Sequence, residues 1–148
     1  MNIKIRRIKK EDIGKLQKFY KSNGMENAGN IGDKFLLDCT DSKLKNYIMF
    51  LVAEVNREIV GAVYFIDQGG LITIWSLAVD EKYRKNGIGS ELVSKGLKYF
   101  GKKRRNMISV ITNLDNYASM QLFKKQGFLK EKKKVRLDKV LILDKDKF

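Results

Sequence analysis

The spacing of apolar residues divides the chain into segments typical of strands and segments typical of helices. Alternating apolar and polar residues, or short apolar runs rich in β-branched side chains, predict strands. These strands are expected over residues 2–8, 50–55, 59–66, 71–79, 107–112, 128–133 and 135–143. Apolar residues spaced three and four apart predict amphipathic helices. These helices are expected to begin at Glu11, near Phe35, at Ile88 and at Asn116.

Turn signals separate these segments and complete the predicted order. Asn56, Arg57 and Glu58 lie between two apolar runs and predict a hairpin turn. Glycines within residues 22–32 indicate a flexible connection, and Gly127 is a natural end for the last helix. The resulting order, β-α-α-β-β-β-α-β-α-β-β, predicts a mixed α/β sheet packed by helices. A chain of 148 residues without internal repeats is expected to form one domain, residues 1–148.

The stretch that joins the strand at 71–79 to the helix at Ile88 is the most informative for function. It reads Arg84-Lys85-Asn86-Gly87-Ile88-Gly89-Ser90. Its two glycines allow a tight turn and a close approach of the backbone to a ligand. The helix that follows offers unpaired N–H groups and the positive end of its dipole, and Arg84 and Lys85 add two cations. The stretch therefore predicts a binding site for a phosphate or a pyrophosphate.

Composition narrows the chemistry that this chain can perform. It contains no histidine, which excludes imidazole bases and Ser-His or Cys-His catalysis by its own residues, and no metal site is expected. Its one cysteine, Cys39, cannot form an internal disulfide, fits a cytoplasmic protein and has the apolar neighbours of a buried thiol. No apolar stretch is long enough to predict a membrane span.

The net charge of +14 favours anionic partners such as coenzyme phosphates, nucleic acid or acidic substrates. The lysines are spread over the whole chain, which is also typical of a solvated surface. The densest cationic runs, at residues 102–105 and 132–134, contain no aromatic residues. A groove for single-stranded nucleic acid needs such residues, so nucleic acid is not the expected partner.

The anion loop and the strand before it resemble the first motif of the GCN5-related N-acetyltransferase (GNAT) family. That motif reads Arg/Gln-x-x-Gly-x-Gly/Ala and follows a strand that ends in Leu-Ala-Val. Arg84, Gly87 and Gly89 match the motif, and the strand ends in Leu77-Ala78-Val79. In the family this loop holds the pyrophosphate of acetyl-coenzyme A.

A later stretch resembles the second motif of the same family, Asn-x-x-Ala-x-x-x-Tyr-x-x-x-Gly-Phe. Asn116, Gly127 and Phe128 match it, and Ser119 replaces the small alanine. Phe123 stands where many members have the tyrosine that is thought to protonate the departing thiolate. Phenylalanine has no proton to donate. By itself this stretch reads as an N-cap followed by an amphipathic helix, with Phe123 in the core.

The resemblance covers nearly the whole chain and implies a specific fold and activity. The implied sheet is mostly antiparallel, with a central parallel pair of strands that splay apart, and has helices on both faces. The implied co-substrate is acetyl-CoA, held by residues 84–90 and Asn116. The implied reaction is direct attack of a primary amine, from a small molecule or a peptide, on the thioester. A monomer or a homodimer is expected.

The resemblance also sets three chemical tasks for the chain. Backbone N–H groups along Leu77-Ala78-Val79 are the candidates that polarise the thioester carbonyl. No carboxylate lies in the strand at 71–79, so Glu54 on the second strand is the first candidate for the base, although it is also an ordinary strand residue. Tyr117, Tyr64 or water would protonate the thiolate, which is also a tolerable leaving group unaided because thiols have a pKa near 8.5.

Trp75 is expected in the core, and its alternative role is a wall of the acceptor pocket. Two other functions compete with acetyl transfer. One is a GNAT-like protein that binds an acyl-CoA with little or no catalysis, consistent with Phe123. The other is a basic protein that binds nucleic acid through its Lys/Arg runs.

Overall fold

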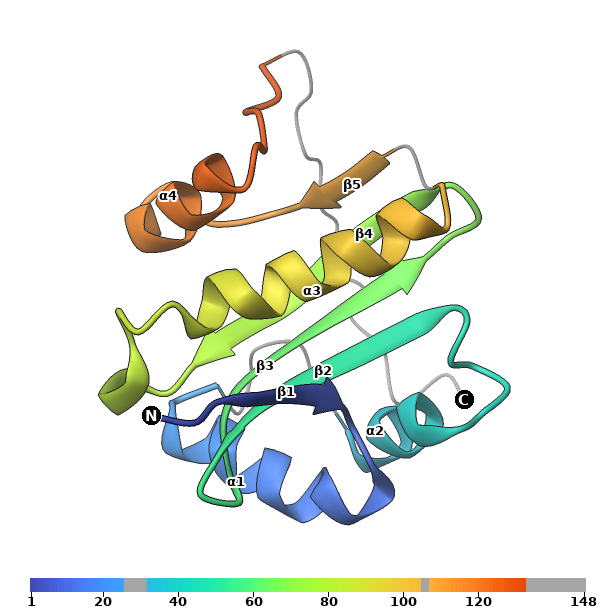
Figure 1. Cartoon of the computed structure of the whole chain (residues 1–148), viewed down its shortest axis with the longest axis vertical. Helices are drawn as coiled ribbons and strands as arrows, with labels where there is room; N and C mark the ends of the chain where they lie inside the picture. The colour runs from blue at the N-terminus through green and yellow to red at the C-terminus, as the bar shows by residue number, and fades with distance from the viewer. Residues whose placement is uncertain (26–31, 105–106, 133–148) are drawn as a thin grey trace, which may run out of the picture.

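A computed structural model of the chain describes residues 1–25, 32–104 and 107–132 (Figure 1). Its strands are β1 (Lys4–Arg7), β2 (Ile48–Val55), β3 (Glu58–Asp67), β4 (Leu71–Val79) and β5 (Met107–Val110). Its helices are α1 (Ile13–Ser22), α2 (Asp33–Thr40), α3 (Ile88–Lys102) and α4 (Tyr117–Lys125), with short 3-10 turns η1 (Lys10–Asp12) and η2 (Glu81–Tyr83).

The strands form one sheet in the order β1-β2-β3-β4-β5. The first three pairings are antiparallel, and β4 and β5 run parallel. This arrangement confirms the predicted mixed, mostly antiparallel sheet with one parallel pair; among the described strands that pair lies at one edge of the sheet, not in its centre. The parallel pairing extends only from Leu71–Met107 to Ile74–Val110, whereas β4 continues to Val79.

Helices cover both faces of the sheet, as predicted. On one face α3 runs alongside β4, and its apolar side packs with β2, β3 and β4 (Figure 1). On the other face α1 and α2 pack on β3 and β2 around a second apolar cluster. Cys39 of α2 belongs to this second cluster, where burial raises the pKa of its thiol to about 12. The predicted buried thiol is confirmed.

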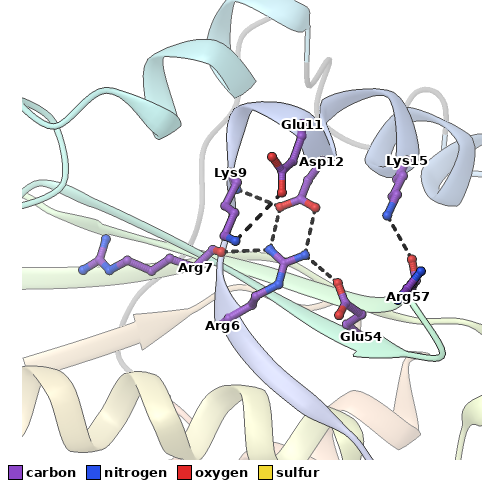
Figure 2. A network of polar contacts seen from close by, with 8 residues as sticks. All are labelled: Arg6, Arg7, Lys9, Glu11, Asp12, Lys15, Glu54 and Arg57. Atoms are coloured by element: carbon purple, nitrogen blue, oxygen red, sulfur yellow. Dashed lines mark hydrogen bonds and ion pairs between the residues drawn. The ribbon is translucent and has the colours of Figure 1, made fainter.

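A network of charged side chains anchors the start of α1 to the sheet (Figure 2). The Arg6 guanidinium donates two hydrogen bonds to the buried Asp12 carboxylate, at 2.6 and 2.9 Å, and a third to Glu54 at 2.6 Å. Asp12 also accepts from the backbone N–H of Lys9 at 2.8 Å. These bonds explain why a helix predicted from Glu11 begins as the 3-10 turn η1 and becomes α-helical only at Ile13.

The β2–β3 hairpin is tighter than predicted. Val55 pairs with Glu58, so the loop contains only Asn56 and Arg57. Both residues have positive φ angles, 50° and 67°, as a two-residue turn with the twist of the flanking strands requires. Glu58, expected in the turn, is the first residue of β3.

The chain after α4 differs from the prediction. Gly127, with φ of 88°, ends the helix as expected. Residues 128–132 form no strand: the Phe128 ring packs back on Phe123, with ring centroids 5.2 Å apart, and Leu129 is 94% exposed. The predicted strand at 128–133 is therefore wrong over its described part. The predicted strand at 135–143 lies outside the described residues.

Candidate functional site

The site lies where β4 and β5 separate. Beyond Ile74 and Val110 the two strands are no longer paired, and a pocket of about 300 Å³ opens between them. Its apolar lining residues are Met25, Ile74, Trp75, Leu77, Val110, Ile111 and Phe123. Its polar lining residues are Thr73, Ser76, Thr112, Asn113, Asn116 and Ser119. None of these described lining residues carries a charge, so the pocket's polarity comes from hydroxyl, amide and backbone groups.

A β-bulge in β4 shapes the wall of this pocket. The register with β3 shifts between Ala62 and Tyr64, and Ser76, on the β4 side of the shift, has a φ of 52°. The extra residue changes which side chains face which side. Ile72 and Ile74 before the bulge, and Leu77 and Val79 after it, all pack in the same apolar cluster. A regular strand would send residues an odd number apart to opposite faces.

Trp75 occupies the pocket wall rather than the core. Its side chain is 41% exposed and lines the pocket, so the expectation of a core residue is wrong. The position just before the bulge, where β5 has already ended, explains its exposure. The alternative sequence interpretation, a wall of a pocket, agrees with this placement.

The backbone N–H and C=O groups of the last three residues of β4 do not all point to the same side. Asp80 donates its backbone N–H to Val60 of β3, so Ala78, two residues earlier, also faces β3. The carbonyl oxygen of Val79 accepts instead from Arg84 Nε at 3.1 Å. In an extended strand the N–H and C=O of one residue point to the same side, so Val79 and Leu77 face the opening left by β5.

The loop before α3 is held by its own hydrogen bonds. Asn86 donates its side-chain amide to the carbonyl oxygens of Tyr83 at 3.2 Å and Arg84 at 3.1 Å. Asp80 accepts from the backbone N–H of Lys82 at 2.9 Å. Asn86 therefore shapes the loop, while the exposed side chains of Arg84 and Lys85 extend from it.

The start of α3 has the backbone geometry that the sequence predicts. Gly87 caps the helix with a φ of 80°, a conformation that glycine adopts without strain. The helical hydrogen bonds begin with the N–H of Glu91, which donates to Gly87 at 2.9 Å. The N–H groups of residues 88–90 precede this ladder, as at any helix start, and are the donors available to an anion.

Ile88 and Gly89, which carry two of these N–H groups, also have packing roles. The Ile88 side chain is buried in the core under α3. A Cβ atom on Gly89 would lie 2.9 Å from Leu122 Cδ1 of α4, so this glycine lets α4 approach α3. The Ser90 carbonyl oxygen accepts from Gln126 Nε2 at 3.3 Å and ties the two helices together.

Asn116 and Phe123 join α4 to the pocket. The Asn116 side chain accepts the backbone N–H of Ser119 at 3.1 Å, which confirms the predicted N-cap. Its remaining amide donors stay available beside the pocket that it lines. Phe123 is 4% exposed and lines the same pocket, so it is at once a core residue and part of the wall.

The two predicted catalytic side chains lie apart from this pocket. Glu54 is not among the lining residues, and its ion pair with Arg6 at 2.6 Å lowers the pKa of its carboxyl, which makes it a weaker base. Tyr117 is 71% exposed and also absent from the lining. Both roles stay predictions.

The structure adds a polar pair that the sequence analysis did not identify. The Ser76 side chain interacts with the hydroxyl of the buried Tyr64, and burial raises the pKa of Tyr64 more than this interaction lowers it. Tyr64 is packed between Phe35 and Phe50, with ring centroids 5.2 and 5.4 Å away. The signal in the sequence was a single serine between apolar residues of a buried strand.

Two other kinds of feature are absent from the described residues. The part of the chain that the structure describes contains no helix long and apolar enough to cross a bilayer. It also contains no group of three or more Cys, Asp or Glu side chains arranged to hold a metal ion.

Comparisons with known proteins agree with this geometry. An uncharacterised N-acetyltransferase of Methanocaldococcus jannaschii is 30% identical over 86 residues, which are 53% of this chain and 38% of that protein. N-alpha-acetyltransferase 30 of Homo sapiens is 32% identical over 92 residues, 57% of this chain and 25% of that protein. The chain thus matches less than half the length of these relatives.

A solved structure shows the same fold with a coenzyme bound. The PaiA N-acetyltransferase of Thermoplasma acidophilum, solved in complex with coenzyme A, superposes with a TM-score of 0.76 and 20% identity. The match covers 88% of this chain and 92% of that chain. The model of the acetyltransferase (GNAT) family matches residues 16–128. This chain therefore belongs to the GNAT acetyltransferase family.

Proposed function

We propose that this protein transfers an acetyl group from acetyl-CoA to a primary amine, by direct attack of the amine in a ternary complex. The observation that supports the proposal is that two features lie together where β4 ends. The pocket opens where β4 leaves β5, and the helix start that suits a pyrophosphate follows directly from the same strand. A coenzyme bound across both would place its thioester in the pocket.

The loop between Arg84 and Ser90 would bind the pyrophosphate. The N–H groups of residues 88–90 and the positive end of the α3 dipole favour an anion there. Arg84 and Lys85 add charge, and the bond from Arg84 Nε to Val79 fixes the base of the Arg84 guanidinium while its other nitrogens stay available. The pantetheine arm would then run between the separated strands, beside Asn116.

The end of β4 would stabilise the charge that develops on the thioester oxygen. The N–H groups of Leu77 and Val79 face the opening left by β5, and Leu77 lines the pocket. Backbone donors fixed in a strand need no reorganisation as the negative charge forms. Attack by the neutral amine forms the C–N bond, collapse breaks the C–S bond, and the amine proton is released as the thiolate departs.

None of the described pocket residues is a carboxylate or a phenol. A neutral amine supplied from solution and a thiolate released with a pKa near 8.5 are compatible with that lining. The same observation favours a second candidate function, an acyl-CoA-binding protein with weak catalysis, because Phe123 supplies no proton.

The test is a panel of amines incubated with acetyl-CoA, with release of the free thiol as the readout. The panel should include free peptide N-termini, lysine peptides, polyamines and aminoglycosides. Transfer to at least one amine above the rate without enzyme is expected. Acetyl-CoA binding without transfer to any of them would favour the weakly catalytic alternative. Salt-sensitive binding of nucleic acid without acetyl-CoA binding would contradict both.

The same assay decides the two predicted catalytic residues. If Glu54 and Tyr117 act as base and acid, Glu54→Gln and Tyr117→Phe lower the turnover of the active amine and change its pH dependence. Unchanged turnover of either variant from pH 6 to about 9 would remove that residue from the mechanism.

A further inference from the structure

The backbone of Ser76, at the bulge in β4, is unusual among the described residues. Five residues other than glycine have positive φ angles. They are Asn56, Arg57, Ser76, Lys85 and Arg104. All except Ser76 lie in turns or loops between elements, whereas Ser76, with φ of 52°, lies inside β4. For a residue with a Cβ atom this conformation costs about 1–2 kcal/mol, so the position would suit glycine better.

The Ser76 hydroxyl has one partner inside the protein and one open side. It interacts with the hydroxyl of Tyr64, a residue that is 7% exposed and whose ring is held by Phe35 and Phe50. A hydroxyl that makes one hydrogen bond, as donor or as acceptor, keeps at least one lone pair as an acceptor. Ser76 lines the pocket, so that lone pair is available to a donor that enters it.

The location of Ser76 indicates that this donor is the N–H group of the acceptor amine. It precedes Leu77, whose N–H faces the side where the thioester oxygen would lie. Its neighbours in the pocket wall are Trp75 and Met25, which follows α1 on the opposite face of the sheet from α3. A coenzyme bound at the start of α3, as proposed above, would approach from the α3 side, which leaves the side of Met25 and Trp75 for the acceptor. An incoming amine carries N–H donors and needs an acceptor to orient it.

We infer that Ser76, oriented by Tyr64, positions the acceptor amine by accepting a hydrogen bond from its N–H group. This inference rests on the proposed function and names a residue pair for it. The strained backbone of Ser76 is then retained for its hydroxyl, in line with the general occurrence of backbone strain at functional sites. Tyr64 is a positioning residue in this arrangement, because it acts only through Ser76.

The decisive variant is Ser76→Gly, which removes the hydroxyl and relieves the positive φ. Its unfolding temperature should stay close to that of the wild type, because the relief of backbone strain offsets the loss of the contact with Tyr64 and the greater freedom of glycine in the unfolded chain. At the same time kcat/KM for the amine should fall about tenfold or more, while the dissociation constant of acetyl-CoA changes less than about twofold. Substitution of a residue with a purely structural role would not lower transfer while the stability and the acetyl-CoA affinity are kept.

Asn56→Gly is the matched control, because Asn56 also has a positive φ but lies in the β2–β3 turn away from the pocket. It should keep or raise the unfolding temperature and leave kcat/KM unchanged. Tyr64→Phe should reduce kcat/KM in the same direction as Ser76→Gly. The double variant should be no slower than Ser76→Gly alone, since Tyr64 acts through the missing hydroxyl.

Three results would overturn the inference. They are Ser76→Gly with wild-type kcat/KM, Ser76→Gly with weakened acetyl-CoA binding to match its loss of transfer, and strictly additive effects of Ser76→Gly and Tyr64→Phe. A wild-type protein that binds acetyl-CoA but acetylates no amine in the panel would overturn the proposed function, and this inference with it. An active wild type with an equally active Ser76→Gly would overturn this inference alone.

Discussion

At the scale of single residues, two glycines of the same motif have different surroundings. A Cβ atom on Gly87 would have no atom within 4 Å, but the φ of 80° requires glycine there. On Gly89 the φ is ordinary, and the added Cβ would lie 2.9 Å from Leu122 Cδ1. The close approach of α4 therefore explains Gly89 without any ligand. The sequence could not separate this packing role from the role in binding.

A second-site variant separates the two roles of Gly89. Gly89→Ala alone is expected to weaken acetyl-CoA binding, whether the cause is the ligand or a displaced α4. In the background Leu122→Ala the packing conflict is gone. If the backbone must approach the pyrophosphate, Gly89→Ala/Leu122→Ala still binds acetyl-CoA about tenfold more weakly than Leu122→Ala, measured by calorimetry. Equal affinities would show that Gly89 serves packing alone.

At the scale of elements, α3 is fixed to the sheet at Gly96. A Cβ atom there would lie 2.2 Å from Phe65 Cζ in the middle of β3. Gly96→Ala should therefore lower the free energy of unfolding by about 1–3 kcal/mol or more through overpacking. Gly101→Ala, in the same helix with no atom within 4 Å of the new Cβ, should raise it by about 0.5–1 kcal/mol. Urea unfolding compares the two, and equal effects would contradict this packing.

The anchor of α1 predicts a dependence of stability on pH. The hydrogen bonds from Arg6 lower the pKa of the Asp12 carboxyl, and Asp12 is only 1% exposed. Folding therefore favours the ionised form. Its contribution to stability is complete above the unfolded-state pKa of about 4 and disappears as the pH falls through the lower folded-state pKa.

Asp12→Asn should reduce the free energy of unfolding at pH 7 by about 1.5–3 kcal/mol, since the charged hydrogen bonds are lost. It should also flatten the decrease in stability below about pH 4. Glu11→Gln is the control, because Glu11 is 75% exposed and lies 3.8 Å from Lys9, so its loss should have little effect. An acid-dependence of Asp12→Asn as steep as that of the wild type would contradict the role of Asp12.

The accuracy of the fold prediction from the sequence differs from element to element. The helix α3, whose apolar side packs on the sheet, begins at Ile88 as predicted, and the continuous apolar run of β2 is predicted to within two residues. The bulge at Ser76 and the exposure of Trp75 depend on where β5 ends, which no local pattern in β4 reveals. A strand is predicted over residues 128–133, but the Phe128 ring packs on Phe123 of α4 instead.

At the scale of the whole molecule, the charged side chains behind the net charge of +14 differ in their distance from the proposed coenzyme site. Arg84 and Lys85 lie at the start of α3, whereas Lys102, Lys103 and Arg104 lie at its other end. Lys103 there lies 4.7 Å from the centre of the Tyr99 ring. The helix has 15 residues and is about 22 Å long, which is roughly two screening lengths at 0.1 M salt. Charges at the far end should therefore contribute little to coenzyme binding.

The most direct measurement is the affinity of acetyl-CoA, by calorimetry at about 0.1 M salt, for the wild type and two variants that unfold at similar temperatures. Arg84→Ala should weaken binding about tenfold to a hundredfold, because a charge-assisted contact to the pyrophosphate is lost. The triple variant Lys102→Ala/Lys103→Ala/Arg104→Ala removes more charge and should weaken binding less than about twofold. No binding by the wild type, or a larger loss in the triple variant than in Arg84→Ala, would contradict the placement of the coenzyme at the start of α3.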